Sequence, residues 1–376
     1  MRRVAAFAML LLATGGAAGR VLPRPADGAD VQAVEAPGSI VAWTDGRGGA
    51  HVAASGVASL ASLRPVDRRT VFHMASVTKP FVATAILQLA EKGRIDLDAP
   101  VTRYLPYLRI DDPRAGAITI RRMLNHSSGL PDIDDYEWGH GPADDGALER
   151  WVRGLPTVRL VSAPGAEFHY SNLAYDLLGD VIAKASGMPF EAYVRRRVLA
   201  PLGMRHASLL LADVDRSRLA APHMPKDGRV AIYPTFPYNR VHAGSSTLYA
   251  DAADMLRWVR YWARPDARLL SEASIAAMLR PTIAIDRPDR ARWQPAMGLG
   301  WSLLTIEGRR IAYHMGQDVG FTTGIMVEPG TGRAVVMMSN IATEAESERV
   351  FDLCLRRMVA MRSPAPVTRS GPYAGE

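Results

Sequence analysis

The spacing of apolar and polar residues changes twice along the chain and divides it into three regions. Near the N-terminus, short apolar runs at 39–44 and 50–55 flank a Gly-rich turn, a pattern that is typical of a β-hairpin. Over about 96–290 the pattern is mainly helical, in segments separated by Pro and Gly. Strand patterns return at 300–304, 310–314, 321–327 and 333–339. We therefore expect an antiparallel sheet made from both ends of the chain, joined to a helical lobe.

Most of the predicted helices begin with a residue whose side chain can accept a hydrogen bond from the first turn. Such caps are Thr119, Asn172, Asp251 and Ser271, which precede helices predicted at 120–125, 173–185, 252–262 and 272–279. Thr343 and Glu346 form a capping-box pattern, which predicts a last helix ending at about Met361. An earlier helix over 76–92 is apolar on nearly every side, so we expect it at the centre of the protein.

The first 19 residues have the three zones of a secretory signal peptide: a basic start, an apolar run over 4–13, and small residues after it. The apolar run is too short to span a bilayer comfortably, and no later segment qualifies. We therefore expect an exported protein, periplasmic or secreted, with no transmembrane anchor in the mature chain. The Pro-rich segment 362–376 is expected to be a flexible tail.

Composition narrows the classes of function. Of the 376 residues, 48% are hydrophobic and 22% charged, which is typical of a globular protein and excludes a disordered chain. The net charge is +7, but the basic residues are almost all Arg and form no long run, so we expect no nucleic-acid partner. The nine His show no metal-ligand spacing and Cys354 is the only Cys, so we expect neither a metal nor another cofactor.

The sequence Ser76-Val77-Thr78-Lys79 is the first candidate for chemistry. Three residues apart on a helix, the Ser76 hydroxyl and the Lys79 amine share one face, where the amine can take the hydroxyl proton. Pro80 prevents a regular helix from extending far upstream, so Ser76 lies at a helix start, where negative charge is favoured. Burial would lower the pKa of the lysine, as a base requires. Because so short a motif also arises by chance, a solvated Ser and Lys without chemistry is the alternative.

Tyr170 and Asn172 are the second candidates, since both lie where a capped helix begins. A phenol beside a lysine ammonium can have a lowered pKa and move protons, and an Asn amide can bind a substrate carbonyl or the lysine. The alternative is that Asn172 only caps the helix and that Tyr170 only packs.

The strand sequence His314-Met315-Gly316-Gln317 is the third candidate. A glycine lets a strand edge lie close against a substrate, and the backbone N–H of Gln317 can pair with that of Ser76 to hold an oxyanion. A histidine on a strand is often structural, which is the alternative for His314.

These three motifs resemble those of the serine β-lactamase and penicillin-recognising hydrolase family. Ser-x-x-Lys at 76–79, Tyr-x-Asn at 170–172 and His-x-Gly at 314–316 have the order and spacing of that family. The resemblance is closest to the branch around class C β-lactamases, which includes D-alanyl-D-alanine carboxypeptidases, D-aminopeptidases and esterases. Further stretches that resemble the family are 72–81, 118–120, 124–130, 201–204 and 298–301.

The resemblance implies a β-lactamase/transpeptidase-like fold of the α/β (α+β) class, with an antiparallel sheet flanked by helices and a mainly helical lobe. One hydrolase domain would cover 35–361. Its sheet lobe would come from about 35–75 and 291–361, and its helical lobe from about 76–290.

The resemblance also implies catalytic roles. Ser76 would attack a carbonyl and become acylated, while Lys79 and Tyr170 exchange protons as base and acid. Water would then release the acyl group. His126 and the turn 127–129 are interpreted as structural.

Substrate binding is implied for the remaining candidates. Asn172 would orient the substrate and Lys79. His314, Gly316 and Gln317 would line the substrate, with the backbone N–H groups of Ser76 and Gln317 forming an oxyanion hole.

The chain departs from the family on this strand, where enzymes specialised for β-lactams or D-alanyl peptides usually carry Lys-Thr-Gly. His314 makes the positive charge conditional on pH, and Met315 removes the Thr hydroxyl, which weakens the case for an anionic substrate. We therefore expect an exported serine hydrolase that acts through an acyl-enzyme on a small-molecule ester, amide or peptide. A D-alanyl-D-alanine carboxypeptidase or weak β-lactamase is one alternative, and a non-catalytic envelope binding protein is another. The natural substrate and the oligomeric state stay open.

Overall fold

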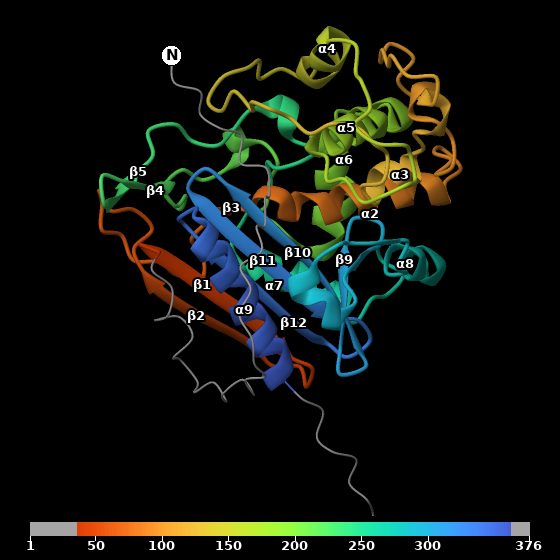
Figure 1. The fold of residues 1–376 in the computed structure, drawn as a ribbon. Helices are drawn as coiled ribbons and strands as arrows, with labels where there is room; N and C mark the ends of the chain where they lie inside the picture. Colours follow the sequence, from red (N-terminus) through yellow and green to blue (C-terminus); the bar gives the residue numbers. More distant parts are fainter. Residues whose placement is uncertain (1–35, 362–376) are drawn as a thin grey trace, which may run out of the picture.

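An eight-stranded antiparallel sheet is the scaffold of the protein, seen in a computed structural model that describes residues 36–361 (Figure 1). Its strands are β1 (Gly38–Asp45), β2 (Ala50–Gly56), β7 (Ile283–Ala284), β8 (Ala296–Met297), β9 (Ser302–Ile306), β10 (Arg309–Asp318), β11 (Phe321–Glu328) and β12 (Arg333–Ser339). They lie in the order β2-β1-β12-β11-β10-β9-β8-β7, so the N-terminal hairpin joins the sheet beside its last strand. The predicted sheet from both ends of the chain is confirmed.

Helices cover both faces of the sheet because strand residues alternate between two apolar faces. Ile40 and Ala42 belong to the main core, whereas Val41 between them belongs to a second apolar cluster. Helix α7 (Ala252–Ala263) packs against β1, β11 and β12 on the side of the main core. Helix α9 (Glu344–Ala360) packs on the opposite face, in front of the sheet in Figure 1.

A mainly helical region lies above the sheet in Figure 1. Its helices are α2 (Lys79–Glu91), α3 (Ile120–Leu124), α4 (Ala147–Gly154), α5 (Asn172–Ser186) and α6 (Phe190–Val194), with α8 (Glu272–Met278) to one side. Helix α2 is buried from Lys79 to Leu89, which confirms the expected central helix. The region predicted to be mainly helical also contains the short strands β4 (His223–Lys226), β5 (Arg229–Ile232) and β6 (Tyr249–Ala250), and strand β7 of the large sheet. Strands β4 and β5 pair with each other, and β6 pairs with β3 (Phe72–His73), which lies before this region.

The chain enters α2 through a tighter turn, the 3-10 helix η1 (Ala75–Thr78). Pro80 has no N–H to donate to the Ser76 carbonyl, and that carbonyl accepts a hydrogen bond from the Lys79 N–H instead. The helix predicted to begin at residue 76 is therefore divided into η1 and α2.

One predicted helix cap is wrong. Ser171, and not Asn172, caps α5, because the Ser171 hydroxyl accepts a hydrogen bond from the Ala174 N–H at 3.0 Å. Asn172 is the first helical residue, so its amide is not used for capping. The other predicted caps accept such bonds in the structure; they are Thr119, Asp251, Ser271 and Thr343.

The predicted signal peptide, residues 1–19, and the tail 362–376 lie outside the described residues. Within 36–361, no helix combines the length and the apolar character that crossing a membrane requires.

The contact between α7 and α2 yields a test of the fold. Trp258 of α7 is fully buried and stacks on Phe81 of α2, with 3.6 Å between ring centroids. We expect Trp258→Ala to lower the free energy of unfolding by about 3–5 kcal/mol in urea unfolding followed by circular dichroism. Val52→Ala is the control, because Val52 is 39% exposed and should change stability by less than about 0.5 kcal/mol. Equal stability of the two variants would contradict this packing.

Candidate active site

Ser76 is the one residue between Val71 and Leu89 that is not buried. The residue before it, Ala75, has a φ of 48°, in the left-handed region that residues other than glycine rarely adopt. Backbone strain of this kind clusters at functional sites. The turn therefore leaves Ser76 partly exposed in an otherwise buried segment.

Lys79 is buried and donates three hydrogen bonds. Its Nζ lies 2.9 Å from Ser76 Oγ, 2.6 Å from Asn172 Oδ1 and 2.9 Å from the Ser245 carbonyl. Burial lowers the pKa of Lys79 to about 8, against the opposing effect of nearby carboxylates. On losing a proton the amine gains a lone pair, and Ser76 Oγ is the one partner of the three that can donate a proton to it.

Tyr170 lies beside this pair. Lys79 Nζ is 4.9 Å from the centroid of the Tyr170 ring. Burial raises the pKa of Tyr170 above its ordinary value, although the neighbouring Ser76 lowers it. The expectation of a lowered phenol pKa is therefore wrong, because loss of solvent, together with nearby carboxylates, outweighs the effect of Ser76. Tyr170 stays protonated at neutral pH.

The ring of His126 packs against the ring of Tyr170. The two rings stack with 4.3 Å between centroids and an angle of 27°. The Ser171 N–H donates to His126 Nδ1 at 3.2 Å, so the ring proton is on Nε2. Burial and the nearby Lys79 keep the pKa of His126 well below its ordinary value, so the ring is neutral. His126 was interpreted as structural, and the residue that it packs against is the catalytic candidate Tyr170.

Asp132 holds Asn172 and was missed by the sequence analysis. Its carboxylate accepts from the Asn172 backbone N–H at 2.7 Å and from Asn172 Nδ2 at 3.3 Å. This leaves Asn172 Oδ1 directed at Lys79 Nζ. Among the carboxylates that raise the pKa of Lys79 and so favour its ammonium form, Asp132 has the largest effect.

A second missed group fixes the Ser245 carbonyl. Asp176 of α5 is fully buried, and it accepts from the Ser245 N–H at 2.8 Å and from His242 Nδ1 at 2.7 Å. His242 ends the 3-10 helix η7 (Arg240–His242). These bonds place the loop that carries the third oxygen partner of Lys79.

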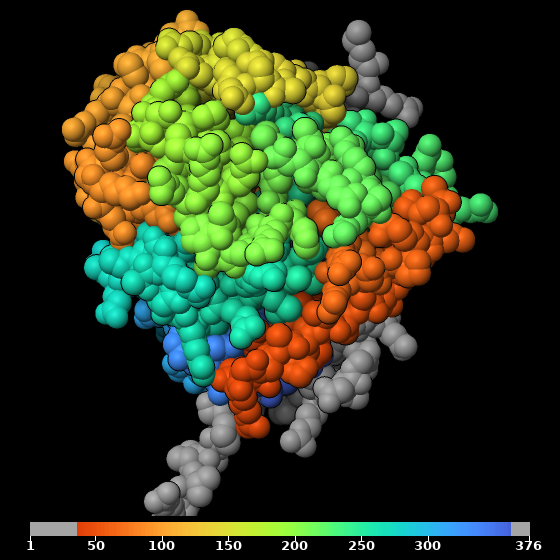
Figure 2. Space-filling model, turned by 180° about the vertical axis from the view of Figure 1, so that it is seen from behind, coloured from red at the N-terminus to blue at the C-terminus, as the bar shows by residue number. Residues whose placement is uncertain are grey.

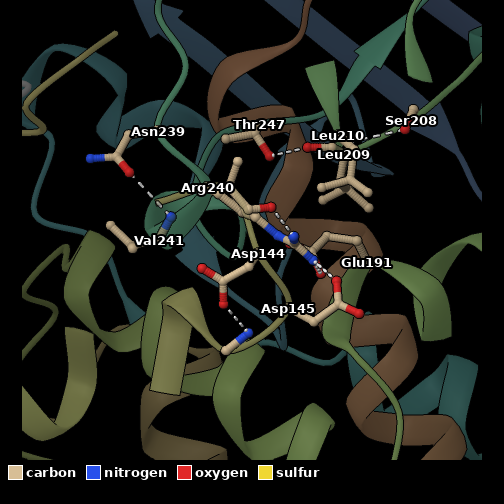
Figure 3. A network of polar contacts seen from close by, with 12 residues as sticks. Asp144, Asp145, Glu191, Ser208, Leu209, Leu210, Asn239, Arg240, Val241 and Thr247 are labelled. Atoms are coloured by element: carbon tan, nitrogen blue, oxygen red, sulfur yellow. Dashed lines mark hydrogen bonds and ion pairs between the residues drawn. The ribbon is translucent and has the colours of Figure 1, made fainter. Parts of the chain in front are cut away.

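Arg240 anchors the other end of η7 (Figure 3). Its guanidinium donates to Glu191 of α6 at 2.7 Å, to Asp145 at 2.7 Å and to the Ala143 carbonyl. Arg240 is only 6% exposed, so the pairing compensates for its loss of solvent. Through η7 this buried pair supports the loop around Ser245.

Strand β10 approaches Ser76 from the sheet. A Cβ on Gly316 would lie 2.5 Å from the Met74 carbonyl oxygen and 3.0 Å from the Ser76 nitrogen, so only glycine permits this approach. Because side chains alternate along a strand, His314 shares the face of Gly316, while the Gln317 side chain turns away. Gln317 Nε2 donates to the Thr343 carbonyl at 2.7 Å. Only the backbone of Gln317 is therefore available to the site.

His314 is buried and uncharged at neutral pH. Its Nδ1 donates to the Met315 carbonyl at 2.7 Å, and burial lowers its pKa to about 3, with a further lowering from Lys79. The positive charge that was expected to depend on pH is therefore absent through the neutral range.

A third missed pair connects the two sides of Ser76. His73 Nε2 donates to Asp318 Oδ2 at 2.9 Å, and the two residues are 245 positions apart in the chain. His73 precedes Ser76 by three residues, and Asp318 follows Gln317 directly. The pair therefore ties η1 to the end of β10, the two segments whose backbone N–H groups are predicted to form the oxyanion hole.

Comparison with known proteins places the chain in a family. A model of the Beta-lactamase family matches residues 27–352, so the chain belongs to this family. It is a serine hydrolase of the β-lactamase-related type, and the predicted fold class is confirmed.

Its relatives include different hydrolases. The chain is 29% identical to esterase EstB of Burkholderia gladioli, over 78% of this chain and 83% of the relative. It is 30% identical to the D-alanyl-D-alanine-carboxypeptidase/endopeptidase AmpH of Escherichia coli (strain K12), over 69% of this chain and 68% of the relative. The structure of D-amino acid amidase from Ochrobactrum anthropi SV3 superposes with a TM-score of 0.71 at 25% sequence identity. The match covers 89% of this chain and 95% of the amidase chain.

The surroundings of Lys79 yield a test by titration. Asp132→Asn removes a negative charge that favours the ammonium, so the Lys79 pKa should fall below its value of about 8. NMR titration of the lysine side chains measures this directly, and the chain has only four lysines to assign. Asp266→Asn, at an exposed carboxylate paired with Arg268, is the matched control and should leave the Lys79 pKa unchanged. A raised Lys79 pKa in Asp132→Asn would refute this electrostatic assignment.

Proposed function

We propose that this protein is an exported serine hydrolase whose Ser76 forms an acyl-enzyme with an ester or with a small amide or peptide. The observation that carries the proposal is the hydroxyl of the partly exposed Ser76, hydrogen-bonded to a buried lysine with a pKa of about 8. At neutral pH roughly a tenth of such a lysine is unprotonated, which is enough to supply a base.

Acylation begins with proton transfer. Unprotonated Lys79 takes the Ser76 proton while Ser76 Oγ attacks the carbonyl carbon of the substrate. The backbone N–H groups of Ser76 and Gln317 stabilise the negative oxygen of the tetrahedral intermediate. The close approach of β10 at Gly316 supports this pairing of donors.

The leaving group departs with a proton. Tyr170 is protonated at neutral pH and lies beside Ser76 and Lys79, so it acts as the acid, and Lys79 replaces its proton. A water molecule then attacks the ester of Ser76, and the same groups act in the reverse direction to release the acid product.

The charges around Ser76 favour a neutral substrate. His314 is uncharged, and the carboxylates of Asp132, Asp176 and Asp318 raise the pKa of Lys79, which places negative charge near the site. At position 314 of β10 a substrate carboxylate would meet a neutral histidine and no fixed cation, and the nearby carboxylates would repel it. An ester or a small amide without a carboxylate fits these charges better, as the likeness to an esterase and an amidase supports.

A peptidase that removes a D-alanyl residue is the second candidate, because AmpH is among the relatives. Export rests on the signal-peptide pattern at residues 1–19 and remains part of the proposal. A non-catalytic binding protein would need no activated serine, and the hydrogen bond from Lys79 to Ser76 argues against it.

Covalent labelling tests the nucleophile. After treatment with a fluorophosphonate, the intact mass of the wild type should increase by one adduct, and Ser76→Ala should show none. Ser217→Ala, at an exposed serine, is the control and should label as the wild type does. Labelling that persists in Ser76→Ala would rule out Ser76 and the proposed mechanism with it.

A matched pair of substrates tests the charge preference. The two esters share one acyl group, and their leaving groups carry either a free carboxylate or its methyl ester. We expect kcat/KM for the neutral member to be higher by about tenfold, since one repelled charge near a protein surface costs on the order of 1–2 kcal/mol. Preference for the carboxylate would favour the D-alanyl peptidase instead.

A further inference from the structure

A hollow lies away from Ser76, between α7 and the hairpin β1–β2. It has a volume of about 390 Å³, and its wall includes Arg257, Arg260, Arg264 and Arg268. Glycines of the β1–β2 and β11–β12 turns form the opposite wall. Figure 2 shows the two parts side by side, with the hairpin in orange and the chain around the end of α7 in teal. The volume falls within the range of small-molecule sites.

The hollow is strongly basic. Its described lining contains four arginines and no Asp or Glu. Two of these arginines pair with carboxylates outside the lining, Arg257 with Asp254 at 2.9 Å and Arg268 with Asp266 at 2.8 Å. Two carboxylates therefore balance only two of the four guanidinium charges, and the hollow carries a net positive charge at neutral pH.

Several of these side chains are already held in place. Arg264 Nη2 donates to the Gly46 carbonyl at 2.8 Å, which ties α7 to the β1–β2 turn. Arg257 is held by Asp254, which is fully buried. Each bond uses one side of the planar guanidinium and leaves other N–H groups unused. Fixed donors lose less entropy when a ligand binds.

The turns allow a ligand to approach closely. Gly332 has a φ of 77°, which favours glycine, and a Cβ there would lie 2.8 Å from Arg264 Nε. At Gly48, with a φ of 101°, no atom lies within 4 Å of the position of a Cβ. Small turns on one side and guanidinium groups on the other leave the hollow open to a compact anion.

We propose that this hollow binds a phosphate group. A guanidinium matches two oxygens of one anion, so several guanidinium groups around one space fit an anion with more than two oxygens better than a carboxylate. The phosphate belongs either to a free small molecule or to the headgroup of an anionic lipid, and both present the same oxygens.

The hollow is separate from the serine site. Gly316 faces Ser76 and pairs with Thr323 at the start of β11, whereas the hollow lies beyond the other end of β11, at Gly332. Binding there does not depend on the proposed hydrolysis, so either proposal can fail without the other.

Two probes distinguish the sources of phosphate. Inorganic phosphate is titrated into the full chain by calorimetry, and vesicles of phosphatidylcholine with or without phosphatidylglycerol are tested by sedimentation. Whichever of the two probes binds the wild type, we expect Arg260→Gln combined with Arg264→Gln to weaken its binding by at least about tenfold. Arg260→Gln alone should weaken it less, and this variant keeps the Arg264 contact with Gly46.

The control variant removes two positive charges from the surface outside the hollow. Arg196→Gln combined with Arg229→Gln changes two exposed arginines outside the hollow and should bind as the wild type does. Loss of phosphate binding in the hollow variants alone supports a free ligand, and loss of vesicle binding alone supports a lipid headgroup. Binding of neither probe, or equal loss in hollow and control variants, would overturn the proposal; thermal melting confirms that each variant is folded.

Discussion

The buried ammonium of Lys79 is the interaction on which the site depends. Moving such a charge out of water costs several kcal/mol unless oxygens replace the solvent. The three oxygens come from η1, from the first residue of α5 and from the loop after η7. These segments meet only in the complete fold, so the reactivity of Ser76 is a product of tertiary structure. The same burial that makes Lys79 costly to charge also lowers its pKa to about 8.

The sequence predicted what depends on local spacing. The alternation of apolar residues predicted β1 and β2 and the strands β9–β12, and the cap residues predicted most helix starts. The three-residue spacing of Ser76 and Lys79 indicated that the two side chains share one face, and their atoms lie 2.9 Å apart. Asn172 was misjudged as a cap because Ser171 beside it caps equally well, and spacing alone does not choose between neighbours.

The sequence did not predict what depends on packing between distant segments. Asp132, Asp176 and the pair of His73 with Asp318 act across 40 to 245 residues, and no local pattern marks them. The pKa of Tyr170 was expected in the wrong direction for the same reason. Proximity to Lys79 follows from a motif, but the loss of solvent around the phenol follows only from the surrounding side chains.

Charge balance explains why the site carries one cation. Burial and, to a lesser extent, Lys79 lower the pKa of His314 to about 3, so the two groups are not charged together at neutral pH. Asp132, Asp176 and Asp318 act in the opposite direction and keep the Lys79 pKa from falling further. A lysine in place of His314 would add a second buried cation and shift Lys79 toward its neutral form. With His314 the chain keeps a lysine that can both take and return a proton near neutral pH, and it gives up a fixed partner for a substrate carboxylate.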